Sequence, residues 1–458
     1  RGGGAGGHDM SIDTDFFSGI NAAAAAEEEH KKTWKLPEHN ELRFEVEQSE
    51  VVTVKLLSGT AEMFGSEMPR GQEIVFDRGG AGCIYTWHGC AVEVYGKPSH
   101  AYVESDTVMQ PTCAIHAALE ARRQRARGSG DNGPRVMVAG PADTGKSTVA
   151  RLLLAYAARM QWKPTLVDMD LGAGMIGVPG SLGVSLVEEP PAINRALKEE
   201  EGATLQYFYG SLDPDANTEL LKLLLEQLAM NVNARQGGKD HERASGCIVN
   251  TRATARSDSP EYRLLLATVA ALSIDVIVVL DQRLFRDLEA AFKASPQISV
   301  VMLKKSGAVA TRSEEERGLV LAQRVKEYFY GMPEGSLSPK RVVYGYVDLE
   351  IYQVGAGVAA SSTMLPIGEE SSVDQLALTP VSKSKAALQH ALCAISLAES
   401  LDEVKSAPVA GYVLISEVDD IKQTITLLTP TYGELPKNIL ILGAGGAEAA
   451  GGLLFPGI

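Results

Sequence analysis

An unbroken run of eight residues, Gly140-Pro-Ala-Asp-Thr-Gly-Lys-Ser147, matches the spacing G-x-x-x-x-G-K-[ST] of a phosphate-binding loop. Glycines let such a loop wrap closely around a phosphate, and its backbone N–H groups supply hydrogen-bond donors. Lys146 is expected to reach the β- and γ-phosphates, and the Ser147 hydroxyl is expected to hold Mg²⁺. The run therefore predicts a nucleotide site formed by Gly140, Asp143, Thr144, Gly145, Lys146, Ser147 and Thr148.

Two carboxylates follow the next apolar segment, where a nucleotide site needs an acidic group. Asp168 and Asp170 close the strand predicted over 165–170, and because they are two residues apart their side chains point to the same side. One of them is expected near the γ-phosphate, where it would hold the metal or orient the attacking group. A further possibility is the end of the strand at 248–251. The alternative interpretation is a turn aspartate that leads into Gly172.

The loop alone does not distinguish ATPases, GTPases and kinases. A GTPase normally recognises its base with an Asn-Lys-x-Asp motif, whereas the corresponding strand here ends in Leu280-Asp281-Gln282. The sequence therefore favours an adenine nucleotide.

A pair of arginines, Arg312 and Arg317, lies beyond the last predicted strand of this region. Phosphoryl-transfer enzymes place arginines there on a lid that neutralises charge on the transferring group. Glu314–Glu316 lie between the two arginines, so the alternative is a salt-bridged surface helix.

Strand and helix patterns place these residues in an α/β protein. From residue 134 to 340, apolar strands alternate with amphipathic helical stretches, which is typical of βαβ units around a parallel sheet covered on both faces. The loop lies between the strand 136–139 and the helix 147–160, as its mechanism requires. The strands expected in this P-loop domain are 135–139, 165–170, 246–250, 276–280 and 300–303.

Two smaller domains are expected to flank the P-loop domain. Residues 34–108 alternate apolar and polar types between spaced glycines, which predicts a small antiparallel β-sandwich with Trp87 in its core. Residues 109–133 are predicted to be a basic helix and linker, and residues 341–458 a small β-rich α/β domain with a flexible end. The Gly- and Ala-rich residues 1–33 are expected to be a disordered tail.

Composition narrows the function classes. The chain has 458 residues, and 43 Lys and Arg against 58 Asp and Glu give a net charge of −15. This balance excludes a surface that is basic throughout, while a small groove for an RNA end stays open. Five dispersed cysteines without a C-x-x-C pair argue against a disulfide framework and favour a reducing compartment. We expect no membrane span and no signal peptide, because no apolar run has the required length.

Several separated runs resemble one family, the polynucleotide 5′-hydroxyl kinase subunit of pre-mRNA cleavage factor II, called cleavage factor IA in fungi. The resemblance covers about residues 34–440. The runs that carry it are Gly140–Thr148, Tyr85-Thr-Trp-His-Gly-Cys90, Ser245-Gly-Cys-Ile-Val-Asn-Thr251, Glu327-Tyr-Phe-Tyr-Gly331, Glu41-Leu-Arg-Phe-Glu-Val-Glu47 and Leu435-Pro-Lys-Asn438.

This resemblance implies ATP with Mg²⁺, tightly held between the N-terminal and central domains. It implies a place in the nuclear cleavage and polyadenylation machinery, with a scaffold subunit docked on the P-loop domain. In animal members it implies RNA 5′-kinase activity and association with the tRNA-splicing endonuclease. Carried over by position, Lys146 and Ser147 match the phosphate and Mg²⁺ residues, and Asp170 matches the general base that activates the RNA 5′-hydroxyl. Arg312 and Arg317 match the lid arginines. Together with Ser147, Asp170 is also the expected metal residue.

Three positions depart from the pattern of the active kinases. Thr254 stands where those kinases have a Trp that stacks on the terminal RNA base, a contact worth about 1–3 kcal/mol. Ala173 replaces the Gln of their Asp-x-Gly-Gln-Gly run, and Lys35 aligns loosely with an acidic residue that clasps the adenine. These changes weaken the case for RNA phosphorylation and leave the phosphate loop complete.

The sequence thus leaves three interpretations of the nucleotide site. We favour a subunit of the cleavage and polyadenylation machinery in which ATP is a structural element that stabilises the fold by mass action. The alternative is an active ATP-dependent RNA 5′-hydroxyl kinase of mRNA and tRNA processing, and a second alternative is an unrelated P-loop NTPase.

Overall fold

The structure is a computed structural model that describes residues 31–443, except 48, 78, 173, 194–203, 255, 333–334 and 356–373. Two compact units form: one within Arg1–Met63 and Glu67–Thr107, the other within Phe64–Ser66 and Val108–Ile458. The P-loop and C-terminal parts share the second unit, and the boundary between them at residue 340 stays a prediction. The tail 1–30, Ala173 and the end 444–458 lie outside the described residues.

The first unit contains two β-sheets, as expected for a sandwich. One sheet has the order β1 (Lys31–Leu36), β8 (Cys90–Tyr95), β3 (Val51–Gly59) and β6 (Glu73–Asp77). The other has the order β5 (Ser66–Glu67), β4 (Glu62–Met63), β7 (Ala81–Tyr85), β2 (Glu41–Glu45) and β9 (His100–Glu104). Strand β1 begins at Lys31, before the expected start at Trp34.

The core of this unit follows the alternating pattern of the sequence. In β3, Val52, Val54 and Leu56 are buried while their neighbours are more exposed, which is the period of two that a half-buried strand requires. The prediction for Trp87 is wrong. Its ring is half-buried and lies edge-on to His39 and Tyr85, because it follows the end of β7 rather than lying within it.

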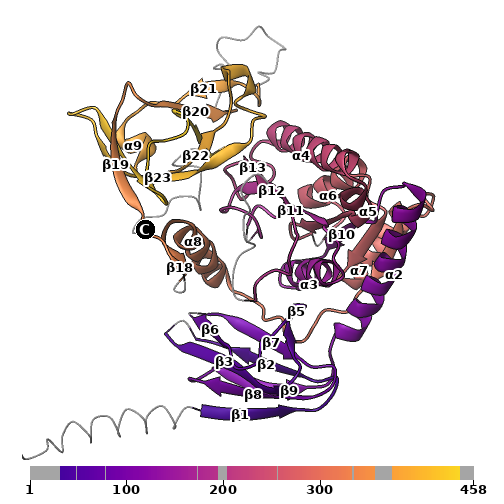
Figure 1. Ribbon diagram of the computed structural model, residues 1–458. Helices are drawn as coiled ribbons and strands as arrows, with labels where there is room; N and C mark the ends of the chain where they lie inside the picture. Colours follow the sequence, from indigo (N-terminus) through magenta and orange to yellow (C-terminus); the bar gives the residue numbers. More distant parts are fainter. Residues whose placement is uncertain are drawn as a thin grey trace, which may run out of the picture. The chain divides into compact units, whose positions relative to one another are not determined.

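The second unit is built on a seven-stranded sheet (Figure 1). Its order is β13 (Thr204–Phe208), β12 (Ser181–Leu186), β11 (Thr165–Met169), β14 (Cys247–Thr251), β10 (Arg135–Ala139), β15 (Val276–Val279) and β16 (Ser299–Met302). Five strands, from β11 to β16 in that order, are parallel as expected. The sheet is mixed at one edge, where β12 runs antiparallel to β11 and β13. Residues 170–180 join β11 to β12, and this link is too short for a crossover helix.

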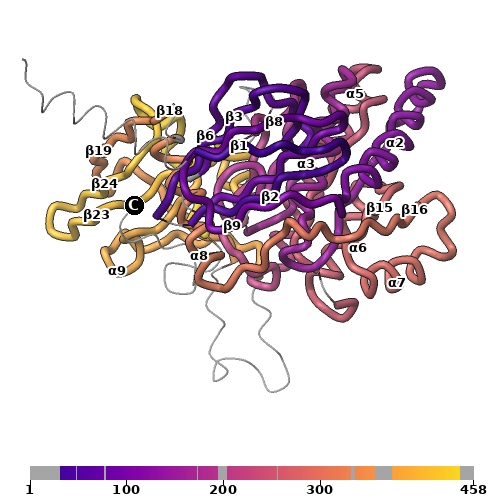
Figure 2. Tube along the Cα trace, turned by 90° about the horizontal axis from the view of Figure 1, so that it is seen from below, coloured from indigo at the N-terminus to yellow at the C-terminus, as the bar shows by residue number. Residues whose placement is uncertain are grey.

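Helices cover both faces of this sheet. They are α2 (Met109–Ser129), α3 (Lys146–Arg159), α4 (Thr218–Gly238), α5 (Asp240–Ser245), α6 (Pro260–Ala271) and α7 (Gln282–Ala291). Val136 and Val138 of β10 pack with α2 and α3, whereas Met137 and Ala139 pack with α4, α6 and α7. Figure 2 shows β15 and β16 between α2 and α7. This double covering holds the ends of the parallel strands in fixed positions at one edge of the sheet.

A second seven-stranded sheet forms the C-terminal part. Its order is β19 (Lys340–Gly345), β24 (Thr424–Thr429), β23 (Val409–Asp419), β22 (Leu392–Ser396), β25 (Ile439–Leu442), β20 (Glu350–Val354) and β21 (Leu378–Pro380). The other elements are α8 (Glu314–Tyr330), β17 (Gly331–Met332), β18 (Gly335–Ser336), α9 (Lys385–Leu388) and a 3₁₀ turn, Leu401–Glu403. Phe329 of α8 packs in one core cluster with Phe208 of β13 and Tyr412 of β23. Tyr412 also donates a hydrogen bond to Gln206, so α8 and β23 are tied to the P-loop sheet.

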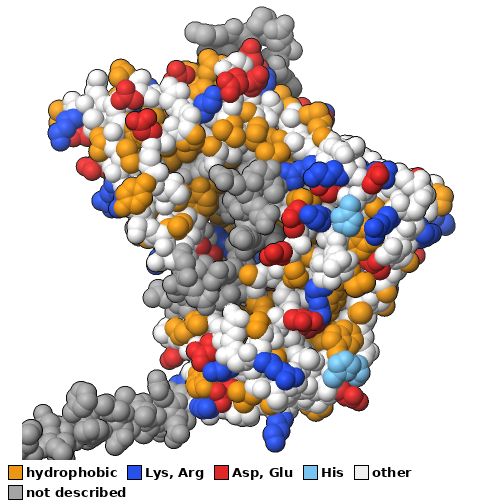
Figure 3. Space-filling model, viewed as in Figure 1, with side chains coloured by type: hydrophobic (Ala, Val, Ile, Leu, Met, Phe, Trp, Pro, Cys, Tyr) orange, Lys and Arg blue, Asp and Glu red, His pale blue; other side chains and the backbone are white. Residues whose placement is uncertain are grey.

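Three whole-chain expectations can be compared with the described residues. All five cysteines are free thiols. Among the helices that the structure describes, none combines the length and the apolar character of a membrane span. On the face shown in Figure 3, basic and acidic side chains are interspersed.

Candidate functional site

The predicted phosphate-binding loop joins β10 to α3, and its backbone is turned by two left-handed residues. Asp143 has φ 52° and Gly145 has φ 90°, a region that costs a non-glycine residue conformational energy. A Cβ on Gly145 would also lie 3.1 Å from Val309 Cγ2, and one on Gly140 would lie 2.9 Å from Thr144 Oγ1. Both glycines are therefore required, and the loop is shaped as a cradle at the N-terminus of α3.

Lys146 lies buried at the start of α3, and its Nζ donates a 2.8 Å hydrogen bond to the Pro141 carbonyl. Burial lowers the pKa of Lys146, while the nearby Asp170 and Asp143 carboxylates oppose that fall. A buried ammonium group next to the backbone of a glycine-bearing loop is a site for an anion. This placement is the one that the motif predicts.

The two aspartates after β11 have different surroundings. Asp168 is buried and accepts hydrogen bonds from Asn250 Nδ2 at 2.9 Å, from the Ile176 amide at 2.9 Å and from the Met175 amide. Asp170 is only half-buried, and its Oδ1 accepts a 3.1 Å hydrogen bond from the Gly172 amide. Asp168 therefore holds the chain that follows β11, whereas Asp170, the less buried of the two carboxylates, is the one that we expect to bind a metal or a proton.

Asp168 makes the stability of the nucleotide-free protein depend on pH. Burial, helped by the charge of Asp170, raises the pKa of Asp168 from 3.8 to about 6. The folded state then binds the proton more tightly than the unfolded state, so the free energy of unfolding falls as pH rises from about 4 to about 6. Above that range the ionised carboxylate costs about 3 kcal/mol.

We expect Asp168→Asn to remove this fall. The check is urea denaturation of the nucleotide-free chain and of the variant between about pH 4.5 and pH 7.5, compared as a difference because other carboxylates titrate in both. A wild-type-minus-variant difference that stays constant across the range would contradict the assignment.

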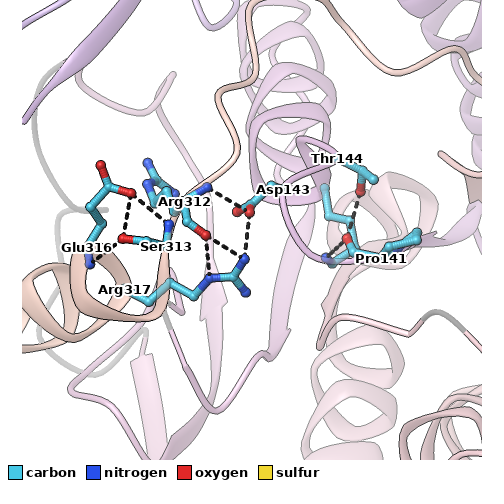
Figure 4. A network of polar contacts seen from close by, with 8 residues as sticks. Pro141, Asp143, Thr144, Arg312, Ser313, Glu316 and Arg317 are labelled. Carbon is cyan, nitrogen blue, oxygen red and sulfur yellow. Dashed lines mark hydrogen bonds and ion pairs between the residues drawn. The ribbon is translucent and has the colours of Figure 1, made fainter.

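The two predicted lid arginines lie against the loop (Figure 4). The Arg312 amide and Arg317 Nη2 both donate to Asp143 Oδ2, at 3.0 Å and 2.7 Å. Arg317 also bonds back to the Arg312 carbonyl, at 3.0 Å from Nη2. A capping box between Ser313 and Glu316 begins α8 at this point. Arg317 thus pairs with a carboxylate of the loop rather than with the glutamates of its own helix.

Breaking this contact is expected to loosen the start of α8 without unfolding the protein. Arg317 is 44% exposed, so its pair with Asp143 contributes at most about 1 kcal/mol. We expect Asp143→Asn and Arg317→Gln each to raise amide hydrogen exchange over residues 308–317, and their double variant to add little. Arg324→Gln, which removes an ion pair within α8, is the matched control. Fully additive effects would show that Asp143 and Arg317 do not act together.

Asn250 lies at the centre of the site, between Ser147 and Asp168. The sequence indicated it only as part of the strand end at 248–251. Its Oδ1 accepts a 3.2 Å hydrogen bond from Ser147 Oγ. Thr254, four residues on, is buried, and its amide donates a 2.9 Å hydrogen bond to the Gly140 carbonyl. Only the pairing of β14 with β10 brings Asn250 beside the loop, and no local pattern in the sequence reports that pairing.

The remaining departures bear less on the geometry. Lys35 is an exposed residue of β1, and Ala173 lies outside the described residues. The described residues hold no group of three or more His, Cys, Asp or Glu side chains that could bind a metal by themselves. Mg²⁺ keeps several waters and takes other ligands from phosphates, so one hydroxyl and one carboxylate fit its needs at a nucleotide site. Ser147 and Asp170 stay the predicted metal residues.

Three family models match successive parts of the chain. Residues 35–126 match an N-terminal β-sandwich domain of polyadenylation factor. Residues 140–331 match the P-loop of mRNA cleavage and polyadenylation factor CLP1, and residues 337–445 match pre-mRNA cleavage complex II protein Clp1. The three matches follow the order of the expected domains.

Curated relatives and solved structures agree with these matches. The polyribonucleotide 5′-hydroxyl-kinase Clp1 of Homo sapiens is 38% identical over 422 residues, which is 91% of this chain and 97% of that protein. The Xenopus laevis protein of the same name is 38% identical over 89% of this chain and 92% of its own length. The wild-type Clp1p–Pcf11p complex has a TM-score of 0.78 at 23% identity, covering 90% of this chain and 97% of that one. A second structure, on the interface between Pcf11p and Clp1p, has a TM-score of 0.78 at 22% identity and covers 90% and 98%.

Proposed function

The chain belongs to the Clp1 family of mRNA cleavage and polyadenylation factors, and from this premise we propose that it is the ATP-binding subunit of that machinery. In this proposal, ATP with Mg²⁺ is held as a structural element that stabilises the folded subunit and its assembly. The subunit works in the nucleus, where pre-mRNA is cleaved.

The observation that carries the proposal is the buried Lys146 ammonium in an intact phosphate-binding loop. Phosphate oxygens can replace the Pro141 carbonyl as its partner, and the loop backbone and the N-terminus of α3 supply further donors. Ser147 and Asp170 would hold Mg²⁺, which neutralises phosphate charge when it is bound. A ligand that binds only the folded chain raises its stability by mass action, so tight binding alone gives ATP a structural role.

A scaffold subunit is the proposed partner, docked on the P-loop part. The support is that Clp1p was solved in complex with Pcf11p and that this chain has the same fold over 90% of its length. No membrane enters the proposal.

An active RNA 5′-hydroxyl kinase is the second candidate. The relatives that are 38% identical carry that name, and Asp170 offers a half-buried carboxylate beside Lys146, where a general base would act. In that case Lys146 and the lid arginines would stabilise charge on the transferring phosphoryl group. Against it, the buried Thr254 offers no aromatic face for an RNA base.

Incubation with γ-labelled ATP and a 5′-hydroxyl RNA oligonucleotide separates the two candidates. We expect the purified chain to release stoichiometric ATP when it is denatured and to transfer little label to RNA. Lys146→Ala and Asp170→Asn serve as controls. Strong labelling of the RNA that both variants abolish would establish the kinase instead, and release of GTP would contradict the ATP site.

A further inference from the structure

Three polar side chains from three elements form a line behind the phosphate-binding loop. Ser147 Oγ, on the first turn of α3, donates to Asn250 Oδ1 at 3.2 Å. Asn250 Nδ2, on β14, donates in turn to Asp168 Oδ1 at 2.9 Å. Asp168 and Asn250 are also direct partners in the parallel ladder of β11 and β14. The sheet therefore sets the distance between them.

The far end of this line cannot move easily. Asp168 is 1% exposed, and its second oxygen, Oδ2, accepts the amides of Met175 and Ile176. Gly174 lies so close that a Cβ there would be 2.7 Å from Asp168 Oδ2. The carboxylate is thus held between a β-strand and the backbone that follows it, and Oδ1 stays aimed at Asn250.

Hydrogen-bond chemistry then orients each group in turn. An ionised carboxylate only accepts, so the side of the Asn250 amide that faces it must be the NH₂ group. The carbonyl side of that amide must face Ser147, and Ser147 must give its single proton to it. The two lone pairs of the Ser147 oxygen are left unused by this bond, and they are what a cation binds.

From this chain of bonds, we propose that Asn250 and Asp168 are positioning residues that keep the Ser147 lone pairs turned towards the magnesium ion of a bound nucleotide. The inference rests on the proposed function, because it concerns the same nucleotide site. In this arrangement the neutral amide of Asn250 contacts the Ser147 hydroxyl, and the buried charge of Asp168 lies behind that amide. Removing a side chain that orients a metal ligand typically lowers the affinity for the metal by about ten- to a hundredfold.

The chain also offers a reciprocal test. Asp168→Asn puts a second amide opposite Asn250, which can then turn over and donate to Ser147, using a lone pair that the cation needs. Asn250→Asp places two buried carboxylates against each other. In the double variant the roles are exchanged: the amide at 168 donates to the carboxylate at 250, which accepts from Ser147, while the amide oxygen at 168 still accepts the Met175 and Ile176 amides.

The measurement is the affinity for ATP of the full-length chain, stripped of nucleotide, by calorimetry in excess Mg²⁺ and again in EDTA. We expect each single variant to weaken binding in Mg²⁺ by about tenfold or more, with a change of less than about threefold in EDTA. The double variant should recover most of the loss. Ser147→Ala, which removes the metal ligand itself, should show the same Mg²⁺-specific loss. Asn250→Ala provides a further single variant if Asp168→Asn does not fold.

Different results overturn different statements. An equal loss in Mg²⁺ and in EDTA would mean that the two residues only support the fold. The proposal would also be overturned if the double variant bound ATP in Mg²⁺ no more tightly than the single variants. Wild-type binding that is independent of Mg²⁺ would overturn it while leaving the ATP site intact, whereas absence of ATP binding under both conditions would remove the proposed function as well.

Discussion

Replacing Lys146 with alanine is expected to reduce the affinity for ATP by about thirtyfold or more. The ammonium group is buried in the loop and is the cation that the motif places against the β- and γ-phosphates. Removing one member of a buried charge pair typically costs about 2–5 kcal/mol, because the other charge stays desolvated. Nucleotide should then be lost during purification, and the rise in melting temperature on adding ATP should disappear.

The matched control for this variant is Lys163→Ala. Lys163 is an exposed lysine that pairs with Glu188 at 2.7 Å, so its removal changes the net charge equally but leaves the loop unchanged. Denaturing each purified protein and identifying the released nucleotide by chromatography gives the occupancy directly. If the Lys146 variant carried as much ATP as the control, the assignment of the phosphate site would be wrong.

Replacing Gly174 with alanine is expected to be the most damaging small change near the carboxylates. A Cβ at this position would lie 2.7 Å from Asp168 Oδ2 and 2.8 Å from the Asp170 carbonyl oxygen. Neither atom can withdraw: Asp168 is held by backbone amides, and the other atom is backbone itself. Overpacking of this kind typically costs about 1–3 kcal/mol. We therefore expect a loss of stability of that size together with weaker binding of Mg²⁺–ATP.

The control for this prediction lies two residues away. A Cβ on Gly172 would be 3.4 Å from Asp170 Oδ1, an ordinary contact, so Gly172→Ala should be nearly neutral. Urea denaturation without nucleotide measures the stability difference, and calorimetry with ATP measures the binding difference. Equal stability of the two variants would contradict the close packing of Gly174.

The parts of the site that one short segment contains were predictable from sequence. The loop, its lysine and its serine lie within eight consecutive residues, and the strand before them and the helix after them follow from local periodicity. The five parallel strands were predicted close to their observed bounds. Four of them, β10, β11, β14 and β15, are buried throughout and form largely apolar runs, and the partly exposed β16 is largely apolar as well. The antiparallel β12 was not predicted, since its direction depends on the length of a link rather than on its own residues.

The roles of the acidic and amide side chains could not be predicted in the same way. Asp168 and Asp170 have the same relation to β11, and only the return of residues 175–176 onto the strand separates them. Asn250 is 103 residues from Ser147, and Asp143 is 174 residues from Arg317. No local pattern reports contacts of that separation.

The sequence by itself therefore determined the phosphate-binding loop and predicted that it holds a nucleotide, because the chemistry of such a loop resides in neighbouring residues and their backbone. The tertiary structure decided which carboxylate is buried, which amide faces the loop serine and which arginine meets the loop aspartate. These contacts depend on the order of the strands in the sheet and on segments that fold back against them. Both bring side chains that are distant in sequence within hydrogen-bond distance and exclude water from some of them.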